Sequence, residues 1–469
     1  MAKKLHSAQG KISAVDITND TISGRGGLFF FLRFVESIGF YSLIEKRFGF
    51  LNRSGKGLRL REFVKQILAY FVDGSDMGMV SFDRRKNDPA YAALLETSPG
   101  RLASSHQMKR FFQKLMVLTN PVYRRLLLYL FMWRLKVEKP NVIVLFADSK
   151  VFDNNDAQKR EGVEPTYRDK RGYHPLHIIW NSYIVDAIFR SGSKHSNHGE
   201  DFVKVMRRLV RHIRKKYSQE VPIIVTSDSA FLDQDAFKVF EEELGIFYIC
   251  VGKLYGDIKD YVKAHNLKDF SRLSNNRQTW CYFEFGNRLK SWSKFRRCIF
   301  TRLETEEDGQ MLFDFAKSDQ VIYTNIGLDK ELTNKLIEAG GETYVQAETI
   351  IQMSHHRGKD ELTHRALSEF ATKEQFPFKR MAMNRAYYYF LVISHFLYEA
   401  YKQDMPEGIV SPCCYPDTFR RTVIDFAVKM VRRGRRIILK VTQAIWESLR
   451  IRELWQWLGQ LEPVLCLRT

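Results

Sequence analysis

Cysteine is scarce in this chain, and its spacing fits no metal ribbon. The 469 residues contain six cysteines, none of them in a C-x-x-C pair, and Cys413 and Cys414 are direct neighbours. Adjacent cysteines suit neither a zinc ribbon nor an ordinary disulfide framework. We therefore expect a reduced protein of the cytoplasm.

Long apolar runs are also lacking. The aromatic-rich run from Ala386 to Ala400 is shorter than the roughly 20 residues of a membrane helix, and it contains His395 and Glu399. The segment Met1 to His6 lacks the apolar stretch of a secretory signal. No internal repeat or low-complexity tract is present. We expect no membrane partner.

Positive charge is in excess. The chain has 74 Lys and Arg against 54 Asp and Glu, a formal net charge of +20. Such an excess favours a polyanionic partner, because each phosphate that is neutralised releases condensed counterions. Ribosome-bound proteins and proteins of anionic membranes share this charge. The length predicts two to four domains, at ~100–200 residues for each.

Two apolar runs far apart in the chain end on an aspartate. One runs from Val142 to Asp148 and the other from Pro222 to Asp228. Each run is continuous and rich in β-branched residues, which predicts a short buried strand. Two carboxylates held side by side on a central sheet would suit a divalent-metal site for phosphoryl transfer.

The pattern of elements predicts an α/β protein with five regions. From Val142 onward it gives three strands, a helix, a strand, a helix and a strand, the order of a ribonuclease-H-like core if the first three strands form a meander. The predicted regions are a helical DNA-binding region (1–140), the first part of the core (141–251), a β insertion (252–325), the second part of the core (326–405) and a basic helical tail (406–469).

The segment from Leu102 to Leu115 predicts a short basic helix. Ser104 or Ser105 can cap it. Its buried stripe would consist of Met108, Phe111, Phe112 and Leu115. Lys109 and Arg110 would then face outward, as in a helix-turn-helix reader of DNA. A solvated helix of a plain bundle explains the pattern equally well.

A third acid would complete a two-metal site, and a long helix expected from about Tyr344 to Leu367 offers one. Arg357, Glu361 and Arg365 follow one another at intervals of four, so they share a helix face. A metal-binding Glu361 between two cations would suit phosphodiester chemistry. The alternatives are a surface Arg–Glu–Arg ladder and Glu348 as the third ligand.

Five short segments carry a resemblance to a known family. They are Ser104 to Phe111, Gly172 to Leu176, Arg190 to Ser196, Ser227 to Phe231, and His356 to Glu361. In this order they resemble the core of insertion-sequence DDE transposases, most closely the family called IS thirteen-eighty within the IS-four-like group. The resemblance spans roughly residues 20 to 440.

The resemblance implies Asp148, Asp228 and Glu361 as a catalytic triad that binds Mg²⁺, with Mn²⁺ as a possible substitute. It also implies a ribonuclease-H-like domain whose β insertion lies between the second Asp and the Glu. The family helix usually carries a Tyr and a Lys where this chain has Ser354 and Ser368. Other cations of this region, Arg365 or Lys373, are candidates to replace their phosphate contacts.

The implied function is cut-and-paste DNA transposition. The enzyme would cut the ends of a mobile element and join the 3′ ends to target DNA. Its partners would be double-stranded DNA, as terminal inverted repeats and target, and a second copy of the chain in a synaptic homodimer. The expected location is the bacterial cytoplasm, at the nucleoid. The alternatives are a metal-dependent DNA nuclease without strand transfer and a catalytically lapsed DNA-binding protein.

Further residues are candidates for DNA contact. Arg190 and Lys194 follow a predicted core strand, and Trp292 lies in a basic part of the β insertion, where it could stack on a base. The alternatives are a solvated loop for the cations and core packing for Trp292, with Trp280 as a second stacking candidate. The histidines at 174, 177, 195 and 198 invite a zinc site, which we favour less than structural or phosphate-binding roles.

Overall fold

The computed structural model describes most of the chain. It covers residues 12, 14–52, 57–74, 78–195, 201–252, 254–265, 269–274, 278–289, 292–305, 319–355, 357–371 and 375–466. Over these ranges, no single helix is long and apolar enough to cross a membrane. By length and composition, the bent pair Gly27–Ser37 and Phe40–Leu51 passes that test when its two helices are taken together.

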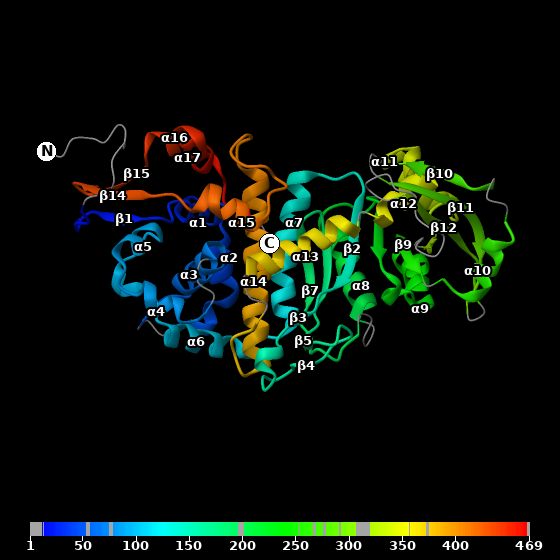
Figure 1. The fold of residues 1–469 in the computed structure, drawn as a ribbon, viewed down its shortest axis with the longest axis horizontal. Coiled ribbons are helices and arrows are strands. Elements are labelled where there is room, and N and C mark those ends of the chain that lie inside the picture. Colours follow the sequence, from blue (N-terminus) through cyan, green and yellow to red (C-terminus); the bar gives the residue numbers. More distant parts are fainter. Residues whose placement is uncertain are drawn as a thin grey trace.

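A nine-stranded mixed sheet is the largest element of the fold (Figure 1). In spatial order its strands are β10 (Ser271–Ser274), β11 (Thr279–Asn287), β12 (Arg296–Thr305), β13 (Asp319–Thr324), β9 (Phe247–Gly252), β8 (Ile223–Ser227), β2 (Ile143–Ser149), β6 (Leu176–Trp180) and β7 (Tyr183–Ile188). The strands predicted to end at the two aspartates, β2 and β8, lie next to each other.

Five neighbouring strands of this sheet, β7, β6, β2, β8 and β9, have the predicted core order. β2, β6 and β7 form an antiparallel meander, while β8 and β9 continue the sheet parallel to β2. Helix α8 (Asp201–Lys216) leads from the meander to β8, and α9 (Gln234–Lys238) with the π-helical turn Val239–Leu244 leads from β8 to β9. The condition set for a ribonuclease-H-like core, a meander of the first three strands, is therefore met.

The strands predicted between residues 252 and 325 extend this same sheet. β13 pairs antiparallel with β9, and β12, β11 and β10 follow by further antiparallel pairing. This pairing covers the backbone edge that β9 would otherwise expose. A second hydrophobic cluster lies here, against α11 (Lys330–Gly340) and α12 (Ala347–His355), and α10 (Gly256–Lys263) follows β9.

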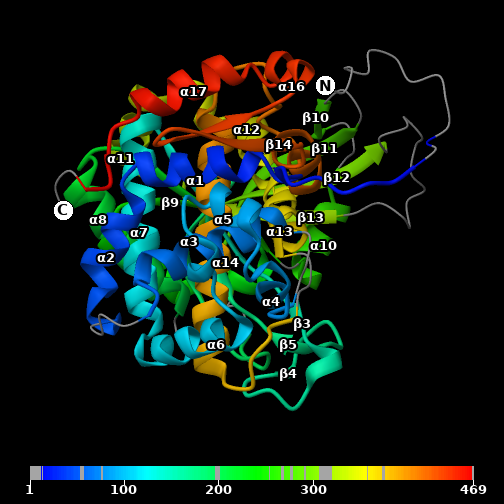
Figure 2. The same cartoon turned by 90° about the vertical axis from the view of Figure 1, so that its left-hand side faces the viewer.

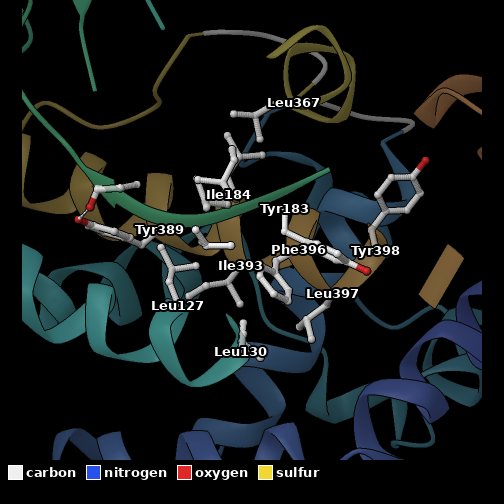
Figure 3. Packing of buried hydrophobic residues seen from close by; sticks show 14 of the residues in the cluster. Leu127, Leu130, Tyr183, Ile184, Leu367, Tyr389, Ile393, Phe396, Leu397 and Tyr398 are labelled. Atoms are coloured by element: carbon white, nitrogen blue, oxygen red, sulfur yellow. Dashed lines mark hydrogen bonds between the residues drawn. The ribbon is translucent and has the colours of Figure 1, made fainter. Parts of the chain in front are cut away.

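Helix α14 (Met381–Asp404) is the buried centre of the helical half. Of its 24 residues, 19 are buried, so the aromatic-rich run of the sequence is a core helix surrounded on all sides. Figure 3 shows its packing against α7 and β7. Labelled contributors are Leu127 and Leu130 of α7, Tyr183 and Ile184 of β7, and Tyr389, Ile393, Phe396, Leu397 and Tyr398 of α14.

The N-terminal region is helical, as predicted. Its helices are α1 (Gly27–Ser37), α2 (Phe40–Phe48), α3 (Leu60–Asp73), α4 (Ser81–Arg85), α5 (Pro89–Leu94), α6 (Ser105–Lys114) and α7 (Asn120–Glu138). Ser104 caps α6 through a capping box with Gln107, and Met108, Phe111 and Phe112 are its buried residues. The hydrophobic core continues from these helices into the sheet.

The long helix expected from about Tyr344 to Leu367 is instead two helices, α12 and α13 (Arg357–Ala371). They belong to different packing environments, because α12 packs on β8, β9 and β12 whereas α13 packs on α3, α14 and α15 (Pro416–Phe419). His356, between them, lies outside the described residues.

The C-terminal region is not entirely helical. It contains α16 (Gln443–Ser448) and α17 (Ile451–Gln460), but also a hairpin of β14 (Val428–Arg433) and β15 (Arg436–Lys440). The N-terminal strand β1 (Thr21–Ser23) pairs with β14, so both ends of the chain contribute to one small sheet. A third sheet joins β3 (Phe152–Asp153), β5 (Arg171–Tyr173) and β4 (Glu164–Pro165) beside the core.

A buried ion pair joins α7 to the edge of the large sheet, and its loss should destabilise the protein. Arg124 donates to both carboxylate oxygens of Asp186 on β7, at 2.7 and 2.8 Å. We expect Asp186→Ala to lower the free energy of unfolding by about 3–5 kcal/mol, because Arg124 would remain buried without its counter-charge. Urea unfolding measures this change. The exposed pair Arg207–Glu243 is the control, since Glu243→Ala should cost about 1 kcal/mol or less. Equal destabilisation of both variants would contradict the prediction.

Candidate active site

The sheet brings the two predicted aspartates to one edge. In the parallel pair β2–β8, Ala147 lies opposite Ser227. The residues that follow these two in the chain are Asp148 and Asp228. Both aspartates line one cavity of about 600 Å³. The carboxyl ends of neighbouring parallel strands thus converge as the sequence predicted. This convergence is the central feature of the site.

Local hydrogen bonds orient both carboxylates. The Ser149 amide donates to Asp148 Oδ1 at 2.7 Å, and the Asp148 side chain is 16% exposed. Asp228 caps the short turn Ser229–Phe231, where it accepts a hydrogen bond from the Ala230 amide at 2.9 Å. Each carboxylate is fixed by the chain that directly follows it.

The rest of the cavity wall is polar and partly cationic. Besides the two aspartates it is lined by Ser149, Pro165, Tyr167, His174, Gly192, Ser193, Lys194, His195, Ser229 and Ala230. Lys194 is half-buried and His195 is exposed. Hydroxyl groups and cations beside two carboxylates can accept a phosphate group and a metal ion at the same place.

A chain of buried side chains reaches Asp148 from behind. His364 Nδ1 lies 3.4 Å from Asp148 Oδ2. On the other side of its ring, His364 Nε2 lies 2.9 Å from His177 Nδ1, and His177 Nε2 lies 2.6 Å from the Tyr388 hydroxyl. His177 is also the cross-strand partner of Asp148 in the pair β2–β6, so both side chains share one face of the sheet.

Burial keeps both imidazoles neutral. It lowers the pKa of His364 to about 3, with Lys150 as a further positive neighbour, and it holds the pKa of His177 well below its usual value. One pair of neutral tautomers fits every contact: Tyr388 donates to His177, His177 donates to His364, and His364 directs its remaining N–H at Asp148. A donor in this place can hold the Asp148 carboxylate in one orientation.

This chain of contacts was not predicted from the sequence. For His177 we weighed zinc against structural or phosphate-binding roles and favoured the latter, but neither His364 nor Tyr388 was a candidate. The spacing of Glu361 and His364, three residues apart on a helix, was the available signal. No sequence signal joins Tyr388 to His177, because α14 and β6 meet only in the folded protein.

The predicted third acid lies on α13, but its side chain is outside the described residues. Glu361 occupies the helix position one turn before His364. The side chain of Arg357, in the first turn, is likewise not described. The structure therefore gives the position of Glu361 in the helix, while its contact with the other two acids stays a prediction.

The cations after strand β7 have different environments. Lys194 lines the cavity, as a DNA contact requires. Arg190, by contrast, is only 4% exposed. It donates to the His174 carbonyl at 3.0 Å and to the Ser149 hydroxyl at 3.2 Å, and its guanidinium lies 3.6 Å from Asp201. The prediction that Arg190 contacts DNA is therefore corrected: it supports the cavity wall from inside.

The other predicted cations are on the surface. Lys109 and Arg110 are exposed on α6, opposite its buried stripe. Arg365 is exposed as well, and it forms an i, i+4 ion pair with Glu369 and lies over the Tyr415 ring. All three side chains are accessible from outside the protein, and their contacts with DNA stay a prediction. The ladder alternative expected Arg365 to pair with Glu361, whereas its described partner is Glu369.

Trp292 does not have the position of a stacking platform. Its side chain is 7% exposed and meets Phe237 and Tyr323 in edge-to-face contacts, with Arg296 over the ring. Trp280 is also buried, against His355. Base stacking needs an open ring face. The prediction of a DNA contact by Trp292 is therefore corrected to the core packing that was its alternative.

Competing acids have other partners. Asp153 pairs with Lys170, and Asp233 caps α9. Glu348, the rival third ligand, accepts a hydrogen bond from the Tyr282 hydroxyl. In the part of the chain that the structure describes, no group of three or more His, Cys, Asp or Glu side chains is placed to hold a metal ion. That set of residues does not include the Glu361 side chain.

The histidines of the zinc alternative are also separated. His174 faces the Lys194 carbonyl at 2.7 Å, whereas His177 belongs to the chain of contacts behind Asp148. His195 is exposed at the cavity, and His198 lies outside the described residues. His174 and His195 thus share the cavity wall, whereas His177 lies in the buried chain of contacts behind it.

Comparisons with known proteins identify one family. The family described as "Transposase DDE domain group 1" matches residues 6–463, nearly the whole chain. A comparison with curated proteins gives no match. Among solved structures, a piggyBac transposase synaptic complex with hairpin DNA, determined by cryo-electron microscopy, is similar with a TM-score of 0.39 and 11% identity. That similarity covers 94% of this chain and 86% of the other.

The neutral state of His364 predicts a loss of stability in acid. Unfolded His364 binds a proton below about pH 6.5, whereas the folded residue resists it down to a pKa of about 3. Stability from this group is therefore present above pH 6.5 and falls as the pH decreases. Between pH 7 and pH 5, we expect the free energy of unfolding to fall by about 2 kcal/mol more in the parent protein than in the His364→Gln variant. Urea unfolding at both pH values tests this. Equal changes in the variant and the parent protein would contradict it.

Proposed function

The chain belongs to the DDE-domain transposases of group 1, and on this premise we propose that it cuts DNA at the ends of a mobile element and joins the 3′ ends to target DNA. The observation that carries the proposal is the placement of Asp148 and Asp228 in one cavity, at the ends of adjacent parallel strands. The finer assignment to the IS thirteen-eighty family rests on the sequence motifs.

The donor set fits a divalent cation. Asp148 and Asp228 present oxygen ligands to one polar cavity, and oxygen is what Mg²⁺ and Mn²⁺ prefer. We assign Glu361 as the third ligand, because it lies one helix turn from His364, whose ring contacts Asp148. When bound, Mg²⁺ would supply activation of the attacking water or 3′-hydroxyl and stabilisation of the leaving oxygen.

The residues around the carboxylates have separate tasks. Lys194 and His195 at the cavity wall would attract and orient the DNA phosphate. Arg190 holds the Ser149 hydroxyl and the His174 carbonyl, and so fixes the wall behind them. His364 directs a neutral N–H at Asp148, which would hold that carboxylate in one orientation.

The remaining regions suggest how DNA is held. We propose that the ribonuclease-H-like core with its β extension performs the chemistry, and that the N-terminal helices contact the element ends through Lys109 and Arg110, both exposed on α6. Arg357 and Arg365 on α13 would contact phosphates near the cavity. Two element ends must meet, so the active form would be a homodimer on double-stranded DNA.

The decisive experiment is a reaction of the full chain with DNA that carries the gene's own flanking sequences. It is run with Mg²⁺, with Mn²⁺ and with EDTA, and the cut and joined products are resolved. Metal-dependent cutting with joining to a second DNA supports the transposase. Cutting without joining would favour a nuclease, and binding without cutting a catalytically lapsed DNA-binding protein.

Removal of one carboxylate should abolish cutting but not DNA binding. We expect Asp148→Asn, Asp228→Asn and Glu361→Gln each to lower the cleavage rate by at least about 10³-fold, since the metal would lose a charged ligand. Gel-resolved cleavage and fluorescence anisotropy measure the two properties separately. Glu348→Gln is the matched control and should cut normally. A Glu361→Gln protein that still cuts would move the third ligand elsewhere.

His364 should act as a positioning residue for Asp148. We expect His364→Ala to raise the Mg²⁺ concentration needed for half-maximal cutting and to lower activity by about 10–100-fold, the usual effect of losing a group that orients a metal ligand. A Mg²⁺ titration of the cleavage rate separates this from a purely structural loss. Tyr389→Phe is the control, because Tyr389 is buried next to Tyr388 but bonds to Ala187 and Asn120 instead. An unchanged Mg²⁺ requirement in His364→Ala would refute the assignment.

A further inference from the structure

The hairpin of β14 and β15 ends in a cluster of arginines. The two strands pair from Lys429–Lys440 to Arg433–Arg436, and a two-residue loop, Gly434–Arg435, joins them. Gly434 has a φ of +59°, a left-handed conformation that favours glycine at the first position of such a loop. The tight loop therefore brings Arg432, Arg433, Arg435 and Arg436 together at one tip, which we call the arginine tip.

The charges of the arginine tip have no carboxylate partner among the residues that the structure describes. All four arginines are exposed, and over the described ranges none of them forms an ion pair; Arg432 donates to the Gly434 carbonyl at 3.2 Å. Exposed or half-buried cations elsewhere do have carboxylate partners. Examples are Arg207 and Arg211 with Glu243, Arg272 with Glu304, and Lys335 with Glu331.

The register of the hairpin adds to the repulsion. Arg433 lies directly opposite Arg436, and Lys429 lies directly opposite Lys440, so one face carries two like-charged cross-strand pairs. Like charges in this position destabilise a hairpin. Of these four, Lys429 has a counter-charge, Asp20 at 2.8 Å. A negatively charged partner would offset this repulsion between the like-charged side chains of the hairpin.

The rest of the fold holds the hairpin in place. β1 pairs with β14, and Met430 and Leu439 pack against the main hydrophobic core. Both views place the hairpin with α16 and α17, and Figure 1 shows this group at the end of the molecule away from β10, β11 and β12 (Figures 1 and 2). No residue of the hairpin lines the cavity of Asp148 and Asp228.

We propose that the arginine tip is a second DNA contact, which binds the phosphate backbone of duplex DNA outside the catalytic cavity. The inference rests on the proposed function for its partner, since a transposase must hold DNA beyond the bond that it cuts. A two-stranded β ribbon fits the major groove of B-form DNA, and the planar guanidinium group pairs well with phosphate oxygens. Duplex DNA is therefore favoured over an anionic lipid surface.

The test compares three full-length variants on the same duplexes. In the first, Arg432, Arg433, Arg435 and Arg436 are all changed to Gln. In the second, the same four are changed to Lys, which keeps the charge. The third is a control that removes equal charge from paired sites: Arg207→Gln, Arg211→Gln, Arg272→Gln and Lys335→Gln. Thermal unfolding verifies that each variant is folded.

The readout is the salt dependence of binding, measured by fluorescence anisotropy on a long and a short duplex. For the long duplex we expect the slope of log K against log[salt] to shrink by up to about 3.6 in the Gln variant, about 0.9 for each phosphate that the protein no longer neutralises. The Lys variant and the control should keep a slope close to that of the parent. On a duplex too short to reach the hairpin, all proteins should bind alike.

The outcomes separate this inference from the proposed function. An unchanged slope and affinity in the Gln variant would overturn the second contact, even if the flanks are still cut and joined. A reduced slope in a chain that does not cut would leave the contact standing and refute the transposase. Loss of binding to phosphatidylglycerol vesicles, with DNA binding unchanged, would overturn the DNA contact in favour of a lipid surface.

Discussion

The parallel pairing of β2 with β8 is the constraint on which the site depends. The register that sets Ala147 opposite Ser227 brings the next two residues, both aspartates, to the same edge of the sheet. A shift of one residue would point one of the carboxylates to the other face, because side chains alternate along a strand. Burial of all of β8 and of most of β2 resists such a shift. The geometry of the acids is therefore stabilised by the hydrophobic core.

The helical half of the protein contributes to the same site from behind the sheet. Helix α13 supplies His364 and the position of Glu361, and α14 supplies Tyr388, whose hydroxyl ends the chain of contacts to Asp148. Because α14 is buried almost throughout and also packs on α1, α3, α6 and α7, the N-terminal helices and the sheet share one core.

Buried and exposed arginines of this protein have different surroundings. Arg124, Arg134 and Arg190 are buried and lie close to carboxylates, so their charges are balanced inside the fold. The arginine tip at residues 432–436 is exposed and has no ion pair among the described residues. The net charge of +20 is therefore not a uniform property of the surface. A composition can indicate a polyanionic partner, whereas the structure shows which cations are available to it.

Much of the fold followed from local patterns. The apolar runs ending in Asp148 and Asp228, the meander before α8, the buried stripe of α6 and the strands β11, β12 and β13 are each encoded within a few residues, as periodicity or as a run of β-branched residues. The division between α12 and α13 and the C-terminal hairpin were missed. In both places the local pattern is ambiguous, and packing partners distant in sequence decide the outcome.

Residue identity and short-range spacing were enough to predict the two aspartates, the basic character and the strands that carry the site. Folding was needed to align His364, His177 and Tyr388 behind Asp148, to bury Arg190 and Trp292, and to leave the arginine tip without an ion pair in the described part of the chain. Each of these features depends on contacts between elements tens to hundreds of residues apart. Such contacts are set by the packing of the whole chain, which no local pattern records.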